Sequence, residues 1–455
     1  MRLSTLSAVA MLANVPGIAP AQPVTSIAAS DQPMLAQTAE AQLLALERTA
    51  QQPLADVIAE FESGRFAPTY QAATTPEERR ALLEQIRTAA AQAGGVGIDQ
   101  EDDGYVMTFD GPATYLVRVT LAKIAPFGIT ALSIDRMAEA TAIQLETLES
   151  EIDSLMAEGG RSGVVYVAID GKVALEKAYG MANADLGTAN TIDTVFGIGS
   201  RPIDFTVAAI YLLEQRGKLG LDDRLDQYFP DAPADRAGMT LRQMMTGKSG
   251  LPDFPVNDSD WDADLGWIDR AEFERRTMAT PLLFEPGNGD AHSHWAFGVL
   301  AAIVERVSGQ GYYPFLRENF FDPAGMARTG NYGESRGLKL TDFAAGGGKQ
   351  VGVPNIPPNW GPTSWLVMGS GGMFSTLGDL RLFYSHVTRG GVLEQRYIEH
   401  FLTPSANLDG SDRGFELFSF TDENRSDEVY VFLNNGGQEA MRPLVRPLVQ
   451  LLKAN

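Results

Sequence analysis

The larger, second part of this chain has strand-forming segments at both of its ends, and this order constrains the fold most. An early pair of β-branched runs, SGVVYVAIDGKVALEKAYG (residues 162–180), is joined by Asp170-Gly171, a dipeptide favoured in two-residue hairpin turns. Two further strand-like runs, GFELFSF (414–420) and EVYVFLNN (428–435), precede a final helical segment. Apolar residues between these strands recur mostly with helical spacing. The order predicts an α+β domain whose first and last strands share one antiparallel sheet flanked by helices.

Residues 35–136 show another order, with helical patterns first and strand patterns afterwards. In TPEERRALLEQIRTAAAQAGG (75–95), Thr75 is placed to cap a helix ahead of Pro76. The segments YVMTFDG, TYLVRVTLAK and GITALSIDR then read as strands. This layout predicts a small, separate α+β domain. It resembles the cystatin-like and NTF2-like modules found ahead of some serine hydrolases.

The chain begins MRLSTLSAVAMLANVPGIAPAQPV, in which one arginine precedes a short apolar run and the small residues Ala19–Ala21. This pattern is typical of a secretory signal, here residues 1–21, although a frayed or buried N-terminal helix is the alternative. The apolar run is too short to span a membrane. With no cysteine, the chain can form neither a disulfide nor a lipid-anchored cysteine. We expect an exported, periplasmic protein.

The charge balance restricts the partners. Lys and Arg total 36 against 58 Asp and Glu, which gives a formal net charge of −22. Because nucleic acids and anionic membrane surfaces are polyanions, this charge disfavours both as partners. We expect a small-molecule ester or peptide-like ligand, no membrane span, no cofactor and no metal. The sequence does not indicate a protein partner.

Several long segments carry a resemblance to a known family. They include FGIGSRPIDFTVAAIYLLEQRGKLGLDDRLDQYFP, MTLRQMMTGKSGLPD, FEPGNGDAHSHWAFGVLAAIVERVSG and GSGGMFSTLGDLRLF, which occur in the family's order. From about residue 145 to 455 the chain resembles the serine β-lactamase and penicillin-binding-protein superfamily, nearest the class C β-lactamase and esterase branch. The resemblance implies a β-lactamase/transpeptidase-like antiparallel sheet with flanking helices and a helical subdomain. The family's chemistry depends on three motifs, and all three are altered here.

The first motif is Ser-x-x-Lys, in which the lysine lies one helical turn from the serine and accepts its proton. Here the motif is Ser200-Arg201-Pro202-Ile203. Ser200 is in register, but Ile203 replaces the lysine and cannot accept a proton. Arg201 points elsewhere around the helix and is too basic to act as a base. The segment therefore predicts a helix capped by Ser200, with Pro202 in the first turn.

The second motif, Tyr-x-Asn, falls at His292-Ser293-His294. Histidine is the commonest general base, so His292 could act on Ser200 as a catalytic dyad while His294 orients it. The two histidines could instead bind a metal, although a third ligand would have to come from elsewhere. Two loop histidines with no chemical role are a further alternative. Lys248, in GKSGL, is expected to be an exposed loop lysine rather than a displaced base.

The third motif is a strand that carries His- or Lys-x-Gly and that binds the substrate carboxylate in the family. Counting back from Gly414-Phe415 places it at Leu408-Asp409-Gly410, where no cation is left and Asp409 would repel a carboxylate. Only three residues separate Pro404 from Leu408, too few for the further strand and turn that the family has there. We therefore expect a sheet that is short of one or more strands, with His294, Asp409 and Gly410 lining the cleft.

Three functions are compatible with these motifs. Because base, tyrosine and cationic strand are all altered, the first is a catalytically impaired relative that serves as a binding or scaffold protein. The second is an active esterase-type hydrolase that uses Ser200 with His292 as base. The third is a peptide or muropeptide binder with an open sheet edge. The sequence favours the impaired relative.

Overall fold

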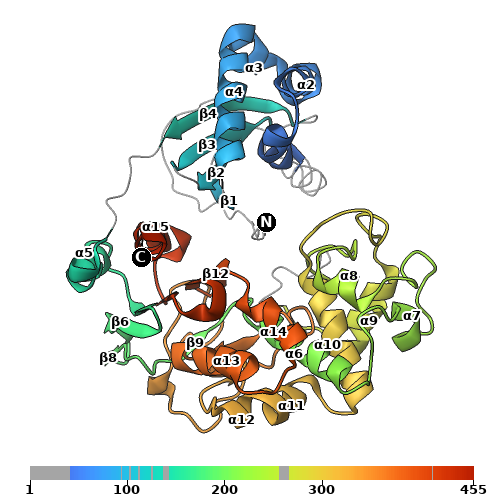
Figure 1. Ribbon diagram of the computed structural model, residues 1–455, viewed down its shortest axis with the longest axis vertical. Helices are drawn as coiled ribbons and strands as arrows, with labels where there is room; N and C mark the ends of the chain where they lie inside the picture. The colour runs from blue at the N-terminus through green and yellow to red at the C-terminus, as the bar shows by residue number, and fades with distance from the viewer. Residues whose placement is uncertain are drawn as a thin grey trace, which may run out of the picture. The chain divides into compact units, whose positions relative to one another are not determined.

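The computed structural model of the protein describes residues 41–454, apart from residues 94, 102–103, 111–112, 124–126, 137–142, 256–265 and 412 (Figure 1). The proposed signal segment, residues 1–21, lies outside the described residues. The chain divides into two compact units after residue 140. None of the helices in the described part of the chain is long and apolar enough to cross a membrane.

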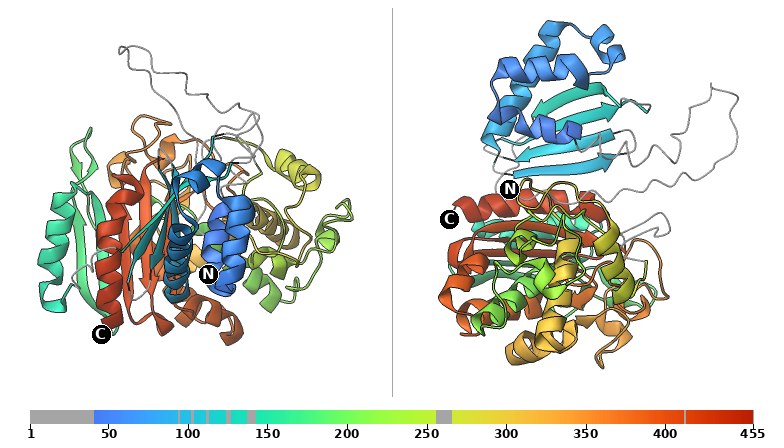
Figure 2. Two further views of the ribbon diagram at one scale, coloured as in Figure 1. Left: turned by 90° about the horizontal axis from the view of Figure 1, so that it is seen from above. Right: turned by 90° about the vertical axis from the view of Figure 1, so that its right-hand side faces the viewer.

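The N-terminal unit has helices followed by a four-stranded antiparallel sheet in the order β1-β2-β3-β4 (Figure 2). Its longest helix begins as expected, because the Thr75 hydroxyl accepts a hydrogen bond from the Glu78 N–H and the Glu78 carboxylate accepts one from the Thr75 N–H. Apolar side chains of the helices pack on the sheet in one core. The elements are α2 (Leu54–Glu60), α3 (Pro68–Ala73), α4 (Pro76–Gln92), β1 (Gly95–Glu101), β2 (Gly104–Asp110), β3 (Tyr115–Leu121) and β4 (Ile129–Arg136). The likeness to cystatin-like or NTF2-like modules stays a prediction.

The second unit is built on a five-stranded antiparallel sheet in the order β12-β13-β14-β5-β6. The expected hairpin is present, since Asp170 and Gly171 both have positive φ angles of 52° and 72° in the turn between β5 and β6. The first strand of the unit, β5, pairs with its last strand, β14, which confirms the predicted α+β fold. The strands are β5 (Gly163–Ile169), β6 (Lys172–Tyr179), β12 (Ser405–Ser411), β13 (Phe415–Thr421) and β14 (Glu428–Leu433).

Both faces of this sheet are buried, which explains the uninterrupted apolar run of β5. Val165 and Val167 point into a core formed with α5 (Leu148–Glu158) and α15 (Gly437–Ala454). Val164 and Tyr166 point to the opposite face, into the largest core of the unit, which the remaining helices cover. Strands that are buried on both sides lose the alternation of polar and apolar residues.

The helices of that second face occupy the middle of the chain. Helices α6 and α10 pack against each other at its centre (Figure 1). The helices are α6 (Pro202–Gln215), α7 (Leu225–Tyr228), α8 (Leu241–Met245), α9 (Arg270–Ala279), α10 (His294–Ser308), α11 (Tyr312–Leu316), α12 (Asp322–Ala324), α13 (Leu377–Arg389) and α14 (Gln395–Leu402). Short strands, β9 (Phe196–Gly197), β10 (Gly330–Asn331) and β11 (Met373–Ser375), form a small sheet beside them, and β7 (Met181–Asn183) pairs with β8 (Thr188–Ala189).

The third motif lies on a regular strand of the main sheet. Asp409 and Gly410 belong to β12, which pairs with β13 along its whole length and forms one edge of the sheet. Across residues 403–411, all of them described, no separate strand precedes the motif strand. The segment thus holds one strand, β12, which carries the motif. That the sheet is short of a strand relative to the family stays a prediction.

Candidate active site

Ser200 lies in the tight turn between β9 and α6. The turn depends on Gly199, which has a φ of 53° and whose place a Cβ-bearing residue could take only by approaching Asp409 and Gly410 of β12 to about 3 Å. This close approach brings Ser200 next to the edge of the main sheet. The expectation that Ser200 caps the helix is wrong: α6 begins at Pro202, the N-cap position is Arg201, and no side chain among the described residues caps it.

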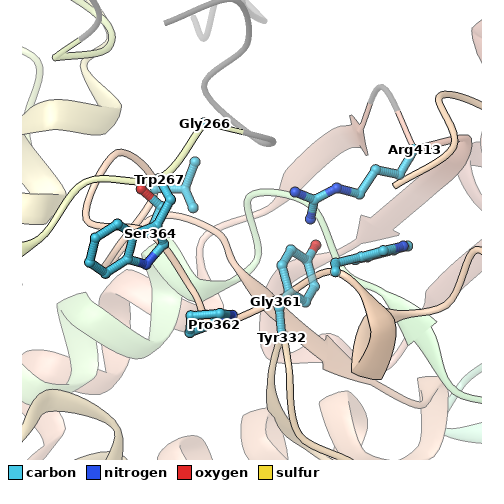
Figure 3. Close-up of a pocket in the computed structure, with 9 residues that line it drawn as sticks. Gly266, Trp267, Tyr332, Gly361, Pro362, Ser364 and Arg413 are labelled. Atoms are coloured by element: carbon cyan, nitrogen blue, oxygen red, sulfur yellow. The ribbon is translucent and has the colours of Figure 1, made fainter. Parts of the chain in front are cut away.

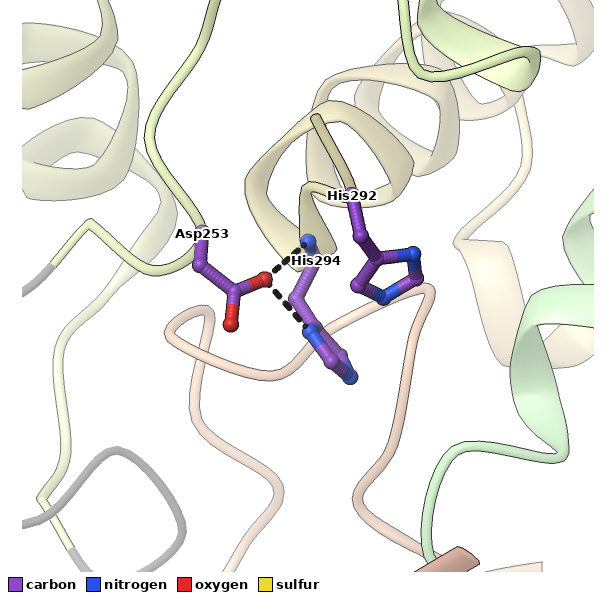
Figure 4. A group of neighbouring side chains, drawn as sticks. All are labelled: Asp253, His292 and His294. Carbon is purple, nitrogen blue, oxygen red and sulfur yellow. Dashed lines mark hydrogen bonds and ion pairs between the residues drawn. The ribbon is translucent and has the colours of Figure 1, made fainter. Parts of the chain in front are cut away.

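The Ser200 hydroxyl bonds to His294 instead. The distance from Ser200 Oγ to His294 Nε2 is 3.0 Å. His294 is the first residue of α10, and its buried ring stacks on Phe254, with centroids 4.3 Å apart. It also meets the His292 ring in a T-shaped contact at 4.6 Å (Figure 4). These two ring contacts restrict the rotation of the imidazole away from the serine.

Asp253 completes the arrangement from a loop 41 residues before His294. Its Oδ1 lies 2.8 Å from His294 Nδ1 and accepts a second hydrogen bond, at 3.1 Å, from the His294 backbone N–H (Figure 4). Its backbone oxygen accepts from the Trp295 N–H at 2.8 Å. The carboxylate is thus fixed at the N-terminus of α10, where the helix dipole favours a negative charge.

The charge state of Asp253 suits this position. Burial on its own would raise the pKa of the Asp253 carboxyl, but the hydrogen bonds from His294 and the nearby imidazoles hold that pKa below its ordinary value. An ionised carboxylate fixes the imidazole proton on Nδ1, which leaves Nε2 to accept the Ser200 proton. Ser200, His294 and Asp253 therefore have the connectivity of a nucleophile, a general base and a group that orients the base.

The two histidines exchange the roles expected from the sequence. His294, expected to orient the base, is the residue bonded to Ser200, whereas His292 is exposed and contacts His294 with its ring edge. The reason is geometric: His294 is the residue that begins α10 and turns inward, while His292 lies two residues before the helix starts. Ile203, at the position of the family's lysine, packs against the large core of the unit.

Asp409 does not present an unpaired charge to the cleft, contrary to the expectation. Its Oδ2 lies 2.6 Å from Arg201 Nη2, and both side chains are buried. Arg201 does point away from Ser200, as expected, but into the protein, where its Nη1 also donates to the Tyr384 hydroxyl at 3.5 Å. The residue after Ser200 thus neutralises Asp409 and is not itself free to bind a substrate carboxylate. Lys248 is about half exposed and pairs with Asp290, as expected for a surface lysine.

The same cluster invites comparison with a metal site. Asp253, His292 and His294 each offer a ligand atom, and these atoms lie within 4.8 Å of one another. Two ligands of a tetrahedral zinc ion at 2.0–2.2 Å would lie about 3.3 Å apart. The 2.8 Å between Asp253 Oδ1 and His294 Nδ1 is a hydrogen-bond distance, and His294 Nε2 already bonds to Ser200. The present geometry fits a hydrogen-bonded catalytic group better than a metal centre.

Asp253 is the residue that sequence reasoning missed. It ends the segment MTLRQMMTGKSGLPD, which carries part of the family resemblance, so an acidic residue next to a motif was visible. No spacing rule connects it with a histidine 41 positions away, because the contact forms only when the loop docks on α10. That docking uses Ser293, whose hydroxyl donates to the Pro252 oxygen at 2.7 Å.

Comparison with known proteins gives consistent matches. A family model described as Beta-lactamase matches residues 148–418. The chain is 29% identical over 213 residues to Penicillin-binding protein 4* of Bacillus subtilis, which is 44% of this chain and 44% of that protein. It is 29% identical over 227 residues to Esterase EstB of Burkholderia gladioli, which is 47% of this chain and 56% of that protein. The chain therefore spans about half the length of these curated relatives.

A solved structure shares the fold. D-amino acid amidase from Ochrobactrum anthropi SV3, complexed with L-phenylalanine amide, superposes with a TM-score of 0.54 at 23% identity. The match covers 68% of this chain and 99% of the amidase chain.

Proposed function

The chain belongs to the β-lactamase family, and from this premise we propose that it is an active serine hydrolase with Ser200 as nucleophile, His294 as general base and Asp253 as the residue that orients the base. One observation carries the proposal: the continuous hydrogen-bonded path from Ser200 Oγ to His294 Nε2 at 3.0 Å and from His294 Nδ1 to Asp253 Oδ1 at 2.8 Å. The lysine of the family motif is replaced in function by a histidine from another helix.

The proposed reaction follows from these contacts. Ser200 Oγ attacks the carbonyl carbon of an ester or amide while His294 Nε2 takes the hydroxyl proton, and the Asp253 carboxylate stabilises the imidazolium that forms. His294 then gives this proton to the departing alcohol or amine. Water enters, His294 takes one of its protons, and the resulting hydroxide displaces Ser200 from the acyl group, with Ser200 regaining its proton.

The developing oxyanion needs hydrogen-bond donors. The Ser200 backbone N–H lies in the turn just before α6, near the positive end of the helix dipole. The edge strand β12 passes against the same turn at Gly410. We assign the donors to these two segments, because backbone N–H groups at a helix N-terminus favour negative charge.

The substrate class follows from the family and the site. One similar protein is named an esterase and one structural neighbour an amidase, so we propose a small ester or a peptide-like amide as substrate. Penicillin or cephalosporin hydrolysis is the activity that this site favours least, since Ile203 and His292 stand where the family's motifs have the lysine and the tyrosine.

The competing function is a catalytically impaired binding protein, and labelling distinguishes the two. The purified protein is treated with a fluorophosphonate probe and, separately, with a chromogenic acetate ester. We expect covalent labelling and turnover in the native chain, both lost in Ser200→Ala and in His294→Gln.

His292→Gln is the matched control, because it makes the same change two residues away, at the histidine that does not contact Ser200. We expect it to retain activity within about tenfold of the native chain, since effects outside the triad are small beside loss of the base. Activity should also survive treatment with a chelator. If the native chain is neither labelled by the probe nor able to hydrolyse the ester, the protein is catalytically impaired. A greater loss of hydrolysis in His292→Gln than in His294→Gln would assign the base to His292.

A further inference from the structure

A small pocket in the second unit is bordered by three aromatic side chains and one arginine. Its volume is about 190 Å³, and its walls include Trp267, Tyr332, Trp360 and Arg413 (Figure 3). Trp267 is largely exposed, and in Figure 3 it lies on one side of the pocket while Arg413 and Tyr332 lie on the other. Pockets that enclose whole drug-sized ligands measure roughly 300–1,000 Å³. This one suits an end group of a ligand.

Arg413 in this pocket is buried, and no described residue gives it an anionic partner. The residue is 2% exposed, and its guanidinium lies over the rings of Trp360 and Tyr332 at 4.5 and 4.8 Å from their centroids. Among the described residues, nothing accepts a hydrogen bond from its buried Nε and Nη1 atoms. The aromatic faces stabilise the cation partly, but they leave these N–H groups unused.

The other buried arginines of the unit show what is missing. Each of them lies within 3.0 Å of a carboxylate oxygen: the pairs are Arg201 with Asp409, Arg236 with Asp235, and Arg276 with Glu272. A buried guanidinium without a carboxylate is costly, and it binds a planar anion through two parallel hydrogen bonds when one is supplied. Arg413 is the exception among these described residues, and it lines the pocket.

The pocket adjoins the triad along two segments. The side chain of Trp360 lies against Gly197, three residues before Ser200, so closely that an added Cβ would be 3.3 Å from its ring. Arg413 follows three residues after Gly410, which touches the turn at Gly199. Three residues of extended chain span at most about 11 Å. A substrate whose scissile bond is at Ser200 could therefore place a nearby group in the pocket.

We propose that this pocket binds a carboxylate on the substrate through the Arg413 guanidinium, so that the enzyme prefers small esters or amides that carry a free acid group. The substrate preference rests on the proposed hydrolase function, whereas carboxylate binding in the pocket does not require catalysis. It places substrate charge recognition at the turn before β13 rather than at Asp409 on β12.

Binding is tested with two probes of the same shape, butyrate and uncharged butyramide. Their titration is followed by the fluorescence of the pocket tryptophans, with Trp267→Phe identifying the reporting residue. We expect the native chain and Ser200→Ala to bind butyrate at least about tenfold more tightly than butyramide, since a hydrogen bond to a charged group contributes that much. Arg413→Gln should abolish the preference, and Arg413→Lys should retain part of it.

The outcomes separate the two proposals. Equal binding of butyrate and butyramide by the native chain overturns the carboxylate site, and this comparison needs no variant to fold. A preference that persists in a folded Arg413→Gln chain, as judged by circular dichroism, overturns the role of Arg413. If the native chain prefers butyrate but hydrolyses no ester, the carboxylate site stands and the hydrolase proposal fails.

Discussion

Two serines lie just before two neighbouring helices in this protein, and their hydroxyl groups make different contacts. At the start of α10, Ser293 accepts a hydrogen bond from the Ala296 N–H at 3.1 Å and donates to the Pro252 oxygen, so its hydroxyl is fully used in structure. At the start of α6, Ser200 leaves the helix uncapped among the described residues and bonds to His294 instead. A serine near a helix start can thus cap the helix, as Ser293 does, or bond elsewhere, which fits the nucleophilic role that we propose for Ser200.

Replacement of Ser200 by alanine gives the largest expected effect. Hydrolysis of the acetate ester should fall by roughly 10⁴-fold or more, because the covalent route is lost. The melting temperature should change little, since no cap is removed. A marked drop in melting temperature with activity retained would show that Ser200 is structural, as Ser293 is.

Replacement of Asp253 by asparagine tests whether the loop residue controls the base. The amide can keep a bond to His294 but favours the wrong tautomer, so kcat should fall on the order of 10³-fold or more. Fluorophosphonate labelling should slow in proportion. A loss of tenfold or less would mean that His294 acts without Asp253.

The ion pair of Arg201 and Asp409 connects the start of helix α6 with strand β12. Arg201→Met should lower the free energy of unfolding by about 3–5 kcal/mol, because it leaves a buried carboxylate without its partner. Denaturant titration measures this loss, and the double variant Arg201→Met/Asp409→Leu should recover much of it. No recovery in the double variant would show that the pair does not act as a unit.

Loss of the cap on α10 should have a smaller effect on stability. Ser293→Ala should cost about 1 kcal/mol of unfolding free energy, the usual value for an N-cap, and should lower activity modestly because Ser293 also anchors the loop before Asp253. Thermal unfolding and ester hydrolysis measure the two effects. A stability loss as large as that of Arg201→Met would remove the contrast between the two helix starts.

The smallest expected effect is a dependence on pH. Because the folded protein holds the pKa of Asp253 below its ordinary value, the ionised carboxylate stabilises the fold above about pH 4, the ordinary range of an aspartate. That contribution is lost as the pH falls through the lowered pKa. The difference in unfolding free energy between native chain and Asp253→Asn should therefore be larger at pH 7 than at pH 3, and a constant difference would contradict the lowered pKa.

The sequence predicted the fold better than the site. Local turn chemistry predicts the Asp170-Gly171 hairpin, and apolar patterns predict that the first and last strands share one sheet. Both kinds of signal can be recognised in a single sequence. The position of Ser200 and the presence of histidines in the second motif were also evident. Their pairing was not, because it depends on where α10 starts, and a shift of two residues decides which histidine points inward.

Contacts between distant segments account for what sequence reasoning could not reach. Asp253 meets His294 only through the docking of a loop on a helix end, and Arg201 meets Asp409 only because Gly199 lets the turn approach β12. Considered motif by motif, the sequence predicted that Asp409 replaces a cation and that Arg201 has no role in the site. In the folded chain, the two residues compensate each other.

The replacement of lysine by Ile203 has a mechanical consequence. In a Ser-x-x-Lys site, nucleophile and base are one turn apart on a single helix, so their separation is set by that helix. Here the proposed nucleophile lies just before α6 and the proposed base begins α10, 94 residues away in the chain, so the core packing between the two helices sets their separation. In the proposed mechanism, the rate of hydrolysis therefore depends on the packing between these two helices. A core substitution that shifts one helix by about 1 Å should abolish hydrolysis while the protein stays folded.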